Sequence, residues 1–365
     1  MKKILIDAYQ YTPVITGTDR MGHNFLRELQ KLDHTNQYVV ICSAEPYIPS
    51  SITNKNFTIL RPPRAPSQRS QRLLSRAWRA TLPTQLKRQR ADTFYSFHNM
   101  RLPRSRVAPR MLTSNLDLIP LKLGAYKNLS TALLKIIQHG AKAADGFVSI
   151  SEYSKRELCD LLHVDPAKIT VIPLAADPLF DGKSRELPKD LPRQFILTMG
   201  GSEPRKNVAT VSAAFSRLPE QLQSAYPLLI VGGSWHGHSL KPMTMHSKHI
   251  RALGAVDDPT LVSLFANTTA FIFASTYEGF GFSILEAMSF GAPVLSATGS
   301  SLDEVTGDAA LTFKPQDVAT LARELERVLT DKSLRQKLHT AGKKRASMFS
   351  WEKSAQALHK LLLDE

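Results

Sequence analysis

The chain has little cysteine, no long apolar run and, over one part of its length, almost no acidic residues. Among its 365 residues are only two cysteines, Cys42 and Cys159, which provide neither a disulfide framework nor metal-ligand spacing. We therefore expect a protein of the reducing cytosol. No run of about 18 apolar residues occurs, so no membrane-spanning helix is expected. The apolar start Ile4-Leu5-Ile6 ends at Asp7, too early for a signal peptide, and indicates a first buried strand.

Acidic residues are scarce in residues 61–110, which contain thirteen Arg or Lys and one acid, Asp92. This basic segment therefore carries 12 of the 15 net positive charges of the chain. The positive charge is therefore a property of this segment and not of the protein as a whole.

Four arginines within the basic segment are spaced three, four and three residues apart, which places them in one stripe of a helix: Arg69, Arg72, Arg76 and Arg79. Leu73, Leu74 and Trp78 occupy the other side, and Pro83 is expected to end the helix. A basic amphipathic helix over residues 69–82 is typical of elements that bind an anionic membrane surface. An ordinary helix that packs its leucines and tryptophan inward fits equally well. Nucleic acid ranks third, because no binding motif accompanies the arginines.

Length and periodicity indicate two α/β domains. The chain exceeds the roughly 250–300 residues at which single cores stop growing. Short apolar runs alternate with helical patterns in both halves, which is typical of parallel sheets. The predicted strands are residues 4–8, 38–41, 57–60, 146–150, 195–198, 228–231, 270–274 and 294–296, and the main predicted helices are residues 20–32, 129–144, 151–162, 208–218, 259–266, 318–329 and 334–349.

Four prolines in residues 173–194 mark an expected linker between an N-terminal domain, residues 1–172, and a C-terminal domain, residues 195–345. Residues 346–365 are expected to form a last helix that packs back on the N-terminal domain. Two such doubly wound domains would face each other across a cleft, because ligands bind beyond the carboxyl ends of parallel strands.

The most informative segment is residues 277–288, in which Glu278 and Glu286 stand eight residues apart with Gly279-Phe280-Gly281 between them. A strand-like run precedes it and helical spacing follows it, so the order is strand, glycine loop, helix. Such a loop brings backbone N–H groups and a helix N-terminus to a phosphate. Glu278 would lie at the loop mouth and Glu286 about two turns into the helix. This arrangement suits a ligand with an anionic middle and hydroxyls at both ends, such as a nucleotide-sugar.

A second segment places two adjacent cations, Arg205 and Lys206, between a glycine turn and a predicted helix. The arginine fork and the lysine charge are suited to phosphate oxygens. Because the helix dipole disfavours cations at this end, their presence indicates an anion between them and the helix. The alternative is a solvated pair of charges at a helix start.

Several motifs together resemble retaining glycosyltransferases of family 4, which have the GT-B fold. They are Gly201-x-x-Pro204-Arg205-Lys206-Asn207, Glu278-Gly279-Phe280-Gly281, Glu286-Ala287-Met288-x-x-Gly291-x-Pro293-Val294, Ser149-x-Ser151-x-x-Ser154, Ser301-Leu302-x-Glu304-Val305 and Ser350-Trp351. The resemblance covers nearly all of residues 146–355 and is looser over residues 1–145.

The resemblance implies roles for these residues. Arg205 and Lys206 would neutralise the donor diphosphate, Glu278 would lie against the transferred sugar, and Glu286 would bind the ribose hydroxyls. The implied catalytic residues are Glu278, Arg205 and Lys206, and the implied donor-binding residues are Gly17, Gly201, Arg205, Lys206, Glu278, Gly279, Phe280, Gly281 and Glu286. The family usually needs no metal, so neither a metal nor a cofactor is expected.

Two motifs of the N-terminal half depart from the family. A loop of the form Gly-x-Gly-Arg-Tyr reads Gly17-Thr18-Asp19-Arg20-Met21, so Asp19 adds bulk and charge beside the expected acceptor and phosphate site. A His-Asp-Leu-x-Pro motif has Leu116 in place of the histidine. The predicted acceptor-side residues are Asp19, Arg20, His98, Asn115 and Asp117. For His98, a surface or core position is an equal alternative.

The sequence therefore predicts a retaining, metal-independent glycosyltransferase of the cytoplasm, peripheral at the inner face of the cell membrane. Its substrates would be a nucleotide-sugar, with GDP-mannose as a first guess, and a saccharide or lipid-linked acceptor in cell-surface polysaccharide or lipopolysaccharide synthesis. An epimerase or phosphorylase of the same fold is a second hypothesis. A non-catalytic member that binds membrane or nucleic acid is a third, motivated by Leu116 and the basic segment.

Overall fold

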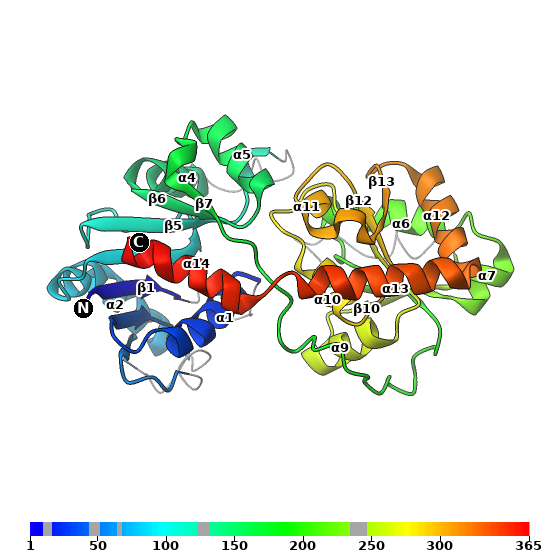
Figure 1. The fold of residues 1–365 in the computed structure, drawn as a ribbon, viewed down its shortest axis with the longest axis horizontal. Helices are drawn as coiled ribbons and strands as arrows, with labels where there is room; N and C mark the ends of the chain where they lie inside the picture. Colours follow the sequence, from blue (N-terminus) through cyan, green and yellow to red (C-terminus); the bar gives the residue numbers. More distant parts are fainter. Residues whose placement is uncertain (10–16, 44–51, 64–67, 123–130, 234–246, 365) are drawn as a thin grey trace. The chain divides into compact units, whose positions relative to one another are not determined.

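The computed structural model of the protein describes residues 1–9, 17–43, 52–63, 68–122, 131–233 and 247–364. Within these ranges, the side chains of residues 68–72, 131 and 132 are outside the description. The chain forms two compact units (Figure 1). Unit 1 consists of Met1–Leu174 and Trp351–Glu365, and unit 2 of Ala175–Ser350. The predicted linker, residues 173–194, contains no helix or strand.

Unit 1 is built on a parallel sheet of seven strands in the order β3-β2-β1-β4-β5-β6-β7. Its elements are β1 Lys3–Asp7, α1 Gly17–Leu32, β2 Gln37–Ile41, β3 Phe57–Leu60, α2 Gln68–Arg88, β4 Thr93–Asn99, β5 Arg110–Asn115, α3 Ile119–Lys122, α4 Thr131–Ala143, β6 Gly146–Ser149, α5 Glu152–Leu162, a 3₁₀ turn Pro166–Lys168, β7 Ile169–Val171 and α14 Trp351–Leu363. Winding reverses between β1 and β4, so this pair is the switch point of the sheet.

Helices cover both faces of this sheet, which explains why its central strands are apolar throughout. Alternate residues of β1 point to opposite faces, and Ile4, Leu5 and Ile6 are all fully buried. Helices α1 and α14 lie side by side on one face (Figure 1), where Phe25 meets Trp351 edge to face at 5.3 Å. The core on the other face includes side chains from three helices, namely Trp78 of α2, Ile137 of α4 and Leu158 of α5.

A polar cluster fastens the last helix within unit 1. The carboxylate of Asp33, which follows α1, contacts Nε2 of His359 in α14 at 2.8 Å and accepts a hydrogen bond from the Tyr38 hydroxyl at 2.7 Å. The hydroxyl of Ser354 donates to the carbonyl of Pro173 at 2.5 Å. Burial alone raises the pKa of Asp33, but hydrogen bonds from Asn36, Tyr38 and Thr35 reverse this and hold the pKa below its ordinary value.

Unit 2 repeats the architecture with a parallel sheet of six strands in the order β10-β9-β8-β11-β12-β13. Its elements are β8 Ile196–Met199, a 3₁₀ turn Pro204–Lys206, α6 Val208–Phe215, α7 Glu220–Ala225, β9 Leu228–Val231, β10 Ile250–Gly254, α9 Asp258–Asn267, β11 Ala270–Phe273, α10 Phe282–Ser289, β12 Val294–Ala297, α11 Leu302–Thr306, a 3₁₀ turn Gly307–Ala309, β13 Leu311–Phe313, α12 Val318–Thr330 and α13 Lys332–Ser347. The switch point lies between β8 and β11.

The structure corrects the prediction for the basic helix. Helix α2 continues through Pro83 to Arg88 rather than ending at Pro83. Leu73 and Leu74 are 60% and 40% exposed, so the expected inward packing holds only for Trp78, which stacks on Tyr9 at 6.1 Å between ring centroids. Arg69 and Arg72 belong to α2, but their side chains lie outside the described part. Among the described helices, none combines the length and apolar character needed to cross a membrane.

Candidate functional site

The predicted catalytic residues of unit 2 lie on the two loops that leave its switch point. Arg205 and Lys206 follow β8, and Glu278 follows β11, which is the neighbour of β8 in the sheet. Parallel neighbours end at the same edge, so two segments some seventy residues apart in sequence are brought together there. The loops are also joined through their backbones, because the Thr276 N–H donates to the Arg205 carbonyl at 2.9 Å.

Glycines allow the loop after β8 to approach its neighbours closely. Gly200 and Gly201 have φ of 142° and 57°, in the region that favours glycine. A Cβ atom on Gly200 would lie 2.2 Å from Cβ of Lys206, and one on Gly201 would lie 2.1 Å from the carbonyl oxygen of Gly233. Larger residues would therefore displace both the backbone after β9 and the lysine itself.

The three charged side chains form a compact ion cluster. Arg205 Nη1 lies 2.7 Å from Oε1 of Glu278, and Lys206 Nζ lies 2.8 Å from the same oxygen. Arg205 also donates from Nε to Glu203 at 2.9 Å and from Nη1 to the Tyr277 carbonyl at 2.8 Å. The side chains of Arg205 and Glu278 are only 9% and 13% exposed, so these contacts are poorly screened by solvent. The cluster thus pairs two cations with two carboxylates.

This pairing fixes the ionisation of the cluster. Burial alone raises the pKa of Glu278, but the charges of Lys206 and Arg205 outweigh it and lower the pKa to about 2. Burial alone lowers the pKa of Arg205, but Glu278 and Glu203 raise it above its ordinary value. At neutral pH, Glu278 is therefore a carboxylate that accepts hydrogen bonds and cannot act as a general acid.

A serine hydroxyl contacts the glycine loop after Glu278. The hydroxyl of Ser301 contacts the carbonyl oxygens of Glu278 and Phe280, each at 2.8 Å. Gly281, with φ of 122°, precedes α10, and a Cβ there would lie 2.8 Å from Leu302. Helix α10 begins at Phe282, so Glu286 lies little more than one turn into it, not about two, and is buried.

Two further residues shape the site and were not predicted from the sequence. Glu203 orients the Arg205 guanidinium, as described above. Asn207 adopts a left-handed conformation with φ of 55°, and its side-chain amide donates to the carbonyls of Ala274 and Pro315 at 3.1 and 2.6 Å. Asn is among the few non-glycine residues that favour this conformation, which is the only sequence signal for its role.

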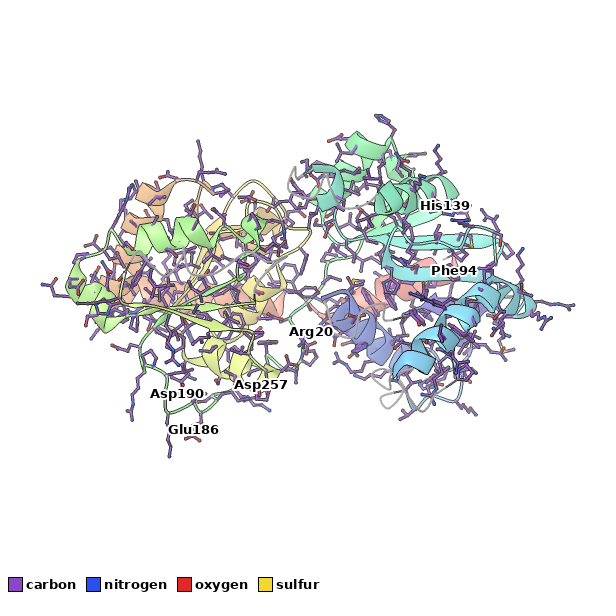
Figure 2. The ribbon with its side chains drawn as sticks, turned by 180° about the vertical axis from the view of Figure 1, so that it is seen from behind. Arg20, Phe94, His139, Glu186, Asp190 and Asp257 are labelled. Carbon is purple, nitrogen blue, oxygen red and sulfur yellow. The ribbon has the colours of Figure 1, made fainter. Side chains whose placement is uncertain are left out.

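The remaining predicted residues lie in unit 1. Gly17 is the exposed first residue of α1, and Asp19 and Arg20 stand in the first turn of that helix. Figure 2 labels Arg20 at this end of α1. Asp117 accepts a hydrogen bond at 3.3 Å from the N–H of Ile119, the first residue of α3. The donor role of Gly17 and the acceptor-side roles of the others stay predictions.

Asn115 lies in the interior of unit 1, and His98 is only partly exposed. Asn115 is fully buried and donates to Ser149 Oγ at 3.2 Å and to the Ser154 carbonyl at 2.8 Å, which makes it a poor acceptor ligand. His98 is the next-to-last residue of β4, two residues beyond Ser96, which pairs with Asp7 at the end of β1. Burial lowers the pKa of His98 although Asp7 opposes this, and burial raises the pKa of Asp7 although His98 opposes that. Sequence reasoning found His98 but missed Asp7.

Two family models match the chain in succession. The model described as Glycosyltransferase Family 4 matches residues 15–178, and that described as Glycosyl transferases group 1 matches residues 180–345. The O-antigen chain mannosyltransferase B of Escherichia coli is 32% identical over 231 residues, which cover 60% of this chain and 60% of that protein. The serotype-specific mannosyltransferase WbdA of Escherichia coli is 34% identical over 172 residues, which cover 45% of this chain and 21% of that protein. The chain thus spans less than two thirds of the length of these relatives.

Solved structures are similar over the whole chain. WaaG, a glycosyltransferase involved in lipopolysaccharide biosynthesis, has a TM-score of 0.72 at 17% identity, covering 99% of this chain and 100% of WaaG. Anabaena HepE in complex with UDP and glucose has a TM-score of 0.74 at 16% identity, covering 100% of both chains. Structural similarity at such low sequence identity shows the fold alone. Both family models are models of glycosyltransferases, which agrees with that fold. The chain belongs to the group 1 glycosyl transferases, with the GT-B fold.

Proposed function

We propose that the protein is a retaining, metal-independent glycosyltransferase that takes a sugar from a nucleotide-sugar. Mannose from GDP-mannose is the first candidate, because two of the curated relatives are described as mannosyltransferases. A saccharide or lipid-linked acceptor in cell-surface polysaccharide synthesis is the corresponding acceptor class. A cytoplasmic protein at the inner face of the membrane would suit this acceptor.

The ion cluster of Arg205, Lys206 and Glu278 at the switch point carries this proposal. Cleavage of the bond between the anomeric carbon and the diphosphate oxygen leaves negative charge on the departing nucleoside diphosphate. Arg205 and Lys206 are placed to stabilise that charge, and the amides at the start of α10 add to it. The acceptor hydroxyl would attack the same face, and its proton would pass to the departing phosphate oxygen, so no protein base is required.

Glu278 would act as a permanent carboxylate in this reaction. With a pKa of about 2 it accepts hydrogen bonds from sugar hydroxyls and stabilises positive charge that develops on the sugar ring. It also accepts a hydrogen bond from Lys206 Nζ at 2.8 Å. Glu286, buried in α10, is proposed to bind the ribose of the nucleotide.

The first experiment is a thermal-shift screen with UDP, GDP, dTDP and ADP, each with and without EDTA. We expect one nucleotide to raise the melting temperature without metal, because a ligand of the folded state stabilises it by mass action. NMR of the matching nucleotide-sugar should then show slow hydrolysis, with the donor's own anomer of the free sugar formed first. No shift with any nucleotide would overturn the proposal, and the opposite anomer would overturn retention.

A second candidate is a non-catalytic protein that binds an anionic membrane surface. It is favoured by the exposure of Leu73 and Leu74 beside Arg76 in α2. It is also favoured by Leu116, which stands where the family's His-Asp-Leu-x-Pro motif has its histidine. Replacing Arg69, Arg72, Arg76 and Arg79 with Gln should then weaken binding to anionic liposomes and leave donor hydrolysis unchanged. Liposome binding without any donor hydrolysis would favour this candidate over the first.

A further inference from the structure

Unit 1 contains a pocket between α2, α4 and the loop that follows β4, with a volume of about 1080 Å³. Its charged lining residues are Arg76 and Arg79 of α2, Arg101 and Arg104 of the loop, Lys135 of α4, and Asp7 at the end of β1. We call this cavity the basic pocket. It is large enough for an organic ligand, and no role has been assigned to it above.

The positive charge of the basic pocket is not neutralised by its own walls. Residues 68–88, 100–104 and 131–143, which form these walls, contain no Asp or Glu. Within the described residues, Arg76, Arg104 and Lys135 form no ion pair. Arg79 lies over the ring of Tyr9 at 5.8 Å, a contact that leaves its charge in place.

Asp7 is a weak counter-charge for these five cations. Its side chain is nearly buried, with a residue exposure of 7%. Its carboxylate accepts hydrogen bonds from the Tyr9 N–H at 3.1 Å and from the Ser96 hydroxyl at 3.5 Å. Among the described lining residues, Asp7 is the one carboxylate, and it faces cations that come from three separate segments. The pocket is therefore suited to an anion supplied from outside.

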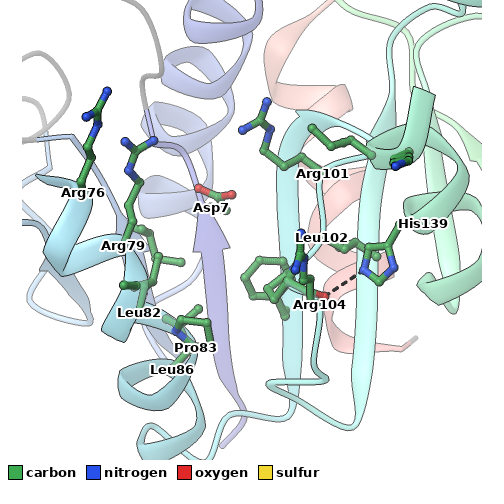
Figure 3. A pocket seen from close by; sticks show the side chains of 16 residues that line it. Asp7, Arg76, Arg79, Leu82, Pro83, Leu86, Arg101, Leu102, Arg104 and His139 are labelled. Atoms are coloured by element: carbon green, nitrogen blue, oxygen red, sulfur yellow. Dashed lines mark hydrogen bonds between the residues drawn. The ribbon is translucent and has the colours of Figure 1, made fainter. Parts of the chain in front are cut away.

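The same face of α2 also supplies an apolar surface. Arg76, Arg79, Pro83 and Leu86 are spaced three, four and three residues apart, so they share one side of the helix. Figure 3 shows Arg76, Arg79 and Arg101 around the end of the pocket where β1 terminates in Asp7, and Leu82, Pro83 and Leu86 further along the helix. The pocket thus joins a cationic end to an apolar end.

We propose that the basic pocket binds a ligand that carries a phosphate group on an apolar chain. Arginine side chains bind phosphate oxygens in pairs of parallel hydrogen bonds, and several arginines lining one pocket favour phosphate over a singly charged carboxylate. Leu82, Pro83 and Leu86 would cover the chain next to the phosphate. The phosphate can belong to a soluble alkyl phosphate or to the headgroup of a membrane phospholipid. The pocket lies in unit 1, whereas the proposed donor residues Arg205, Lys206 and Glu278 lie in unit 2.

Calorimetry with octyl phosphate tests this proposal on the full chain, with inorganic phosphate and octyl glucoside as the two half-ligands. We expect octyl phosphate to bind and each half-ligand to bind at least about tenfold more weakly, the factor that one charge-assisted contact contributes. The double variant Arg76→Gln/Lys135→Gln should weaken octyl phosphate binding by at least about the same factor. The matched control is Arg88→Gln/Lys168→Gln, which removes two exposed cations of unit 1 that do not line the pocket.

The outcomes separate this site from the donor site. Binding that survives Lys206→Gln and the control but is lost in Arg76→Gln/Lys135→Gln supports the proposal. Loss of binding with Lys206→Gln alone assigns the phosphate to the ion cluster and overturns the proposal. Equal losses of binding in the pocket and control variants overturn the proposal as well, and so does a wild type that does not bind octyl phosphate. All the exchanged pocket residues are exposed, so unchanged circular dichroism should accompany each loss.

Vesicles distinguish the two sources of the phosphate. The wild type is tested on phosphatidylcholine vesicles with and without phosphatidic acid, and octyl phosphate is added as a competitor. Displacement by octyl phosphate supports a lipid headgroup as the ligand of the pocket. Octyl phosphate binding without any vesicle binding supports a soluble ligand in the same pocket.

Discussion

The two sheets of this protein share one topology, yet their switch points differ in electrostatics. In unit 2, Arg205 and Lys206 lie within 2.9 Å of carboxylate oxygens of Glu203 and Glu278. In unit 1, β1 ends in the buried Asp7, His98 is the next-to-last residue of β4, and cations gather in the adjoining basic pocket, where Asp7 is the carboxylate among the described lining residues. The fold places both sets at strand ends, but it does not decide whether the charges are compensated.

This difference indicates two modes of anion binding. On our proposal for unit 2, a donor diphosphate would share Lys206 and Arg205 with Glu278, whose contacts order the cluster, so little reorganisation would be needed. In unit 1 the exposed arginines and Lys135 are held by few contacts, so a ligand has to order them as it binds. We therefore expect changes in the cluster to alter reactivity and stability together, and changes in the basic pocket to alter binding alone.

The largest expected effect is on donor hydrolysis by Glu278→Gln. This change keeps the shape of the side chain but removes the charge that faces Arg205 and Lys206. We expect hydrolysis of the matching nucleotide-sugar to fall by about 100-fold or more, the loss that follows removal of one transition-state contact. NMR or coupled release of the nucleoside diphosphate measures it. Glu326→Gln, an exposed acid in α12, is the control, and equal rates in the wild type and Glu278→Gln would disprove the role given to Glu278.

A smaller effect is expected when one arginine is removed from each region. Arg205→Ala should weaken nucleotide binding by about 1.5–3 kcal/mol. It should also lower the free energy of unfolding by about 1–3 kcal/mol, because Glu278 and Glu203 lose a partner while they stay partly buried. Arg76→Ala, at an exposed position, should change that free energy by less than about 0.5 kcal/mol. Calorimetry measures the nucleotide affinity of Arg205→Ala, and denaturant unfolding measures the free energy of unfolding of both variants. Unchanged nucleotide affinity in Arg205→Ala would refute the phosphate assignment, and equal destabilisation would remove the contrast between the regions.

Much of unit 2 could be predicted from the sequence because its strands, glycine turns and helices each have a recognisable local residue pattern. Strand β9, residues 228–231, was predicted at its observed bounds, as was β3 of unit 1, residues 57–60, and the fold class is confirmed. The meeting of Lys206 with Glu278 follows from a general property of parallel sheets, since neighbouring strands end at one edge. The resemblance to a family supplied the roles, which stay predictions.

The rest depended on contacts that no local pattern specifies. Asn207 reaches the carbonyl of Pro315, 108 residues further along the chain, and Asp7 is buried beside His98 of another strand. Strands β4 and β5 were overlooked because they lie in or beside the basic segment, although Phe94-Tyr95 in β4 is typical of a strand. Strand β13 has only three residues, too few to show a period.

The smallest expected effect concerns pH, and its sign differs between the regions. Glu278 has a pKa lowered from 4.5 to about 2, so its contribution to stability is present above pH 4.5 and is lost as the pH falls toward about 2. Asp7 has a raised pKa, so its contribution is fully present below pH 3.8 and is lost as the pH rises through its folded-state pKa. Removing each charge should therefore have opposite consequences at neutral pH.

We expect Asp7→Asn to stabilise the protein at pH 7 by about 0.5–2 kcal/mol, the usual range for a single stabilising change. The amide can still accept from the Tyr9 N–H, and the cost of burying a charge is removed. At pH 3 the gain should vanish, because Asp7 is then protonated in the folded and largely in the unfolded chain. Denaturant unfolding at both pH values measures it, with Glu278→Gln as the variant of opposite sign. A stabilisation of equal size at pH 3 would show that packing, and not the buried charge, separates the two switch points.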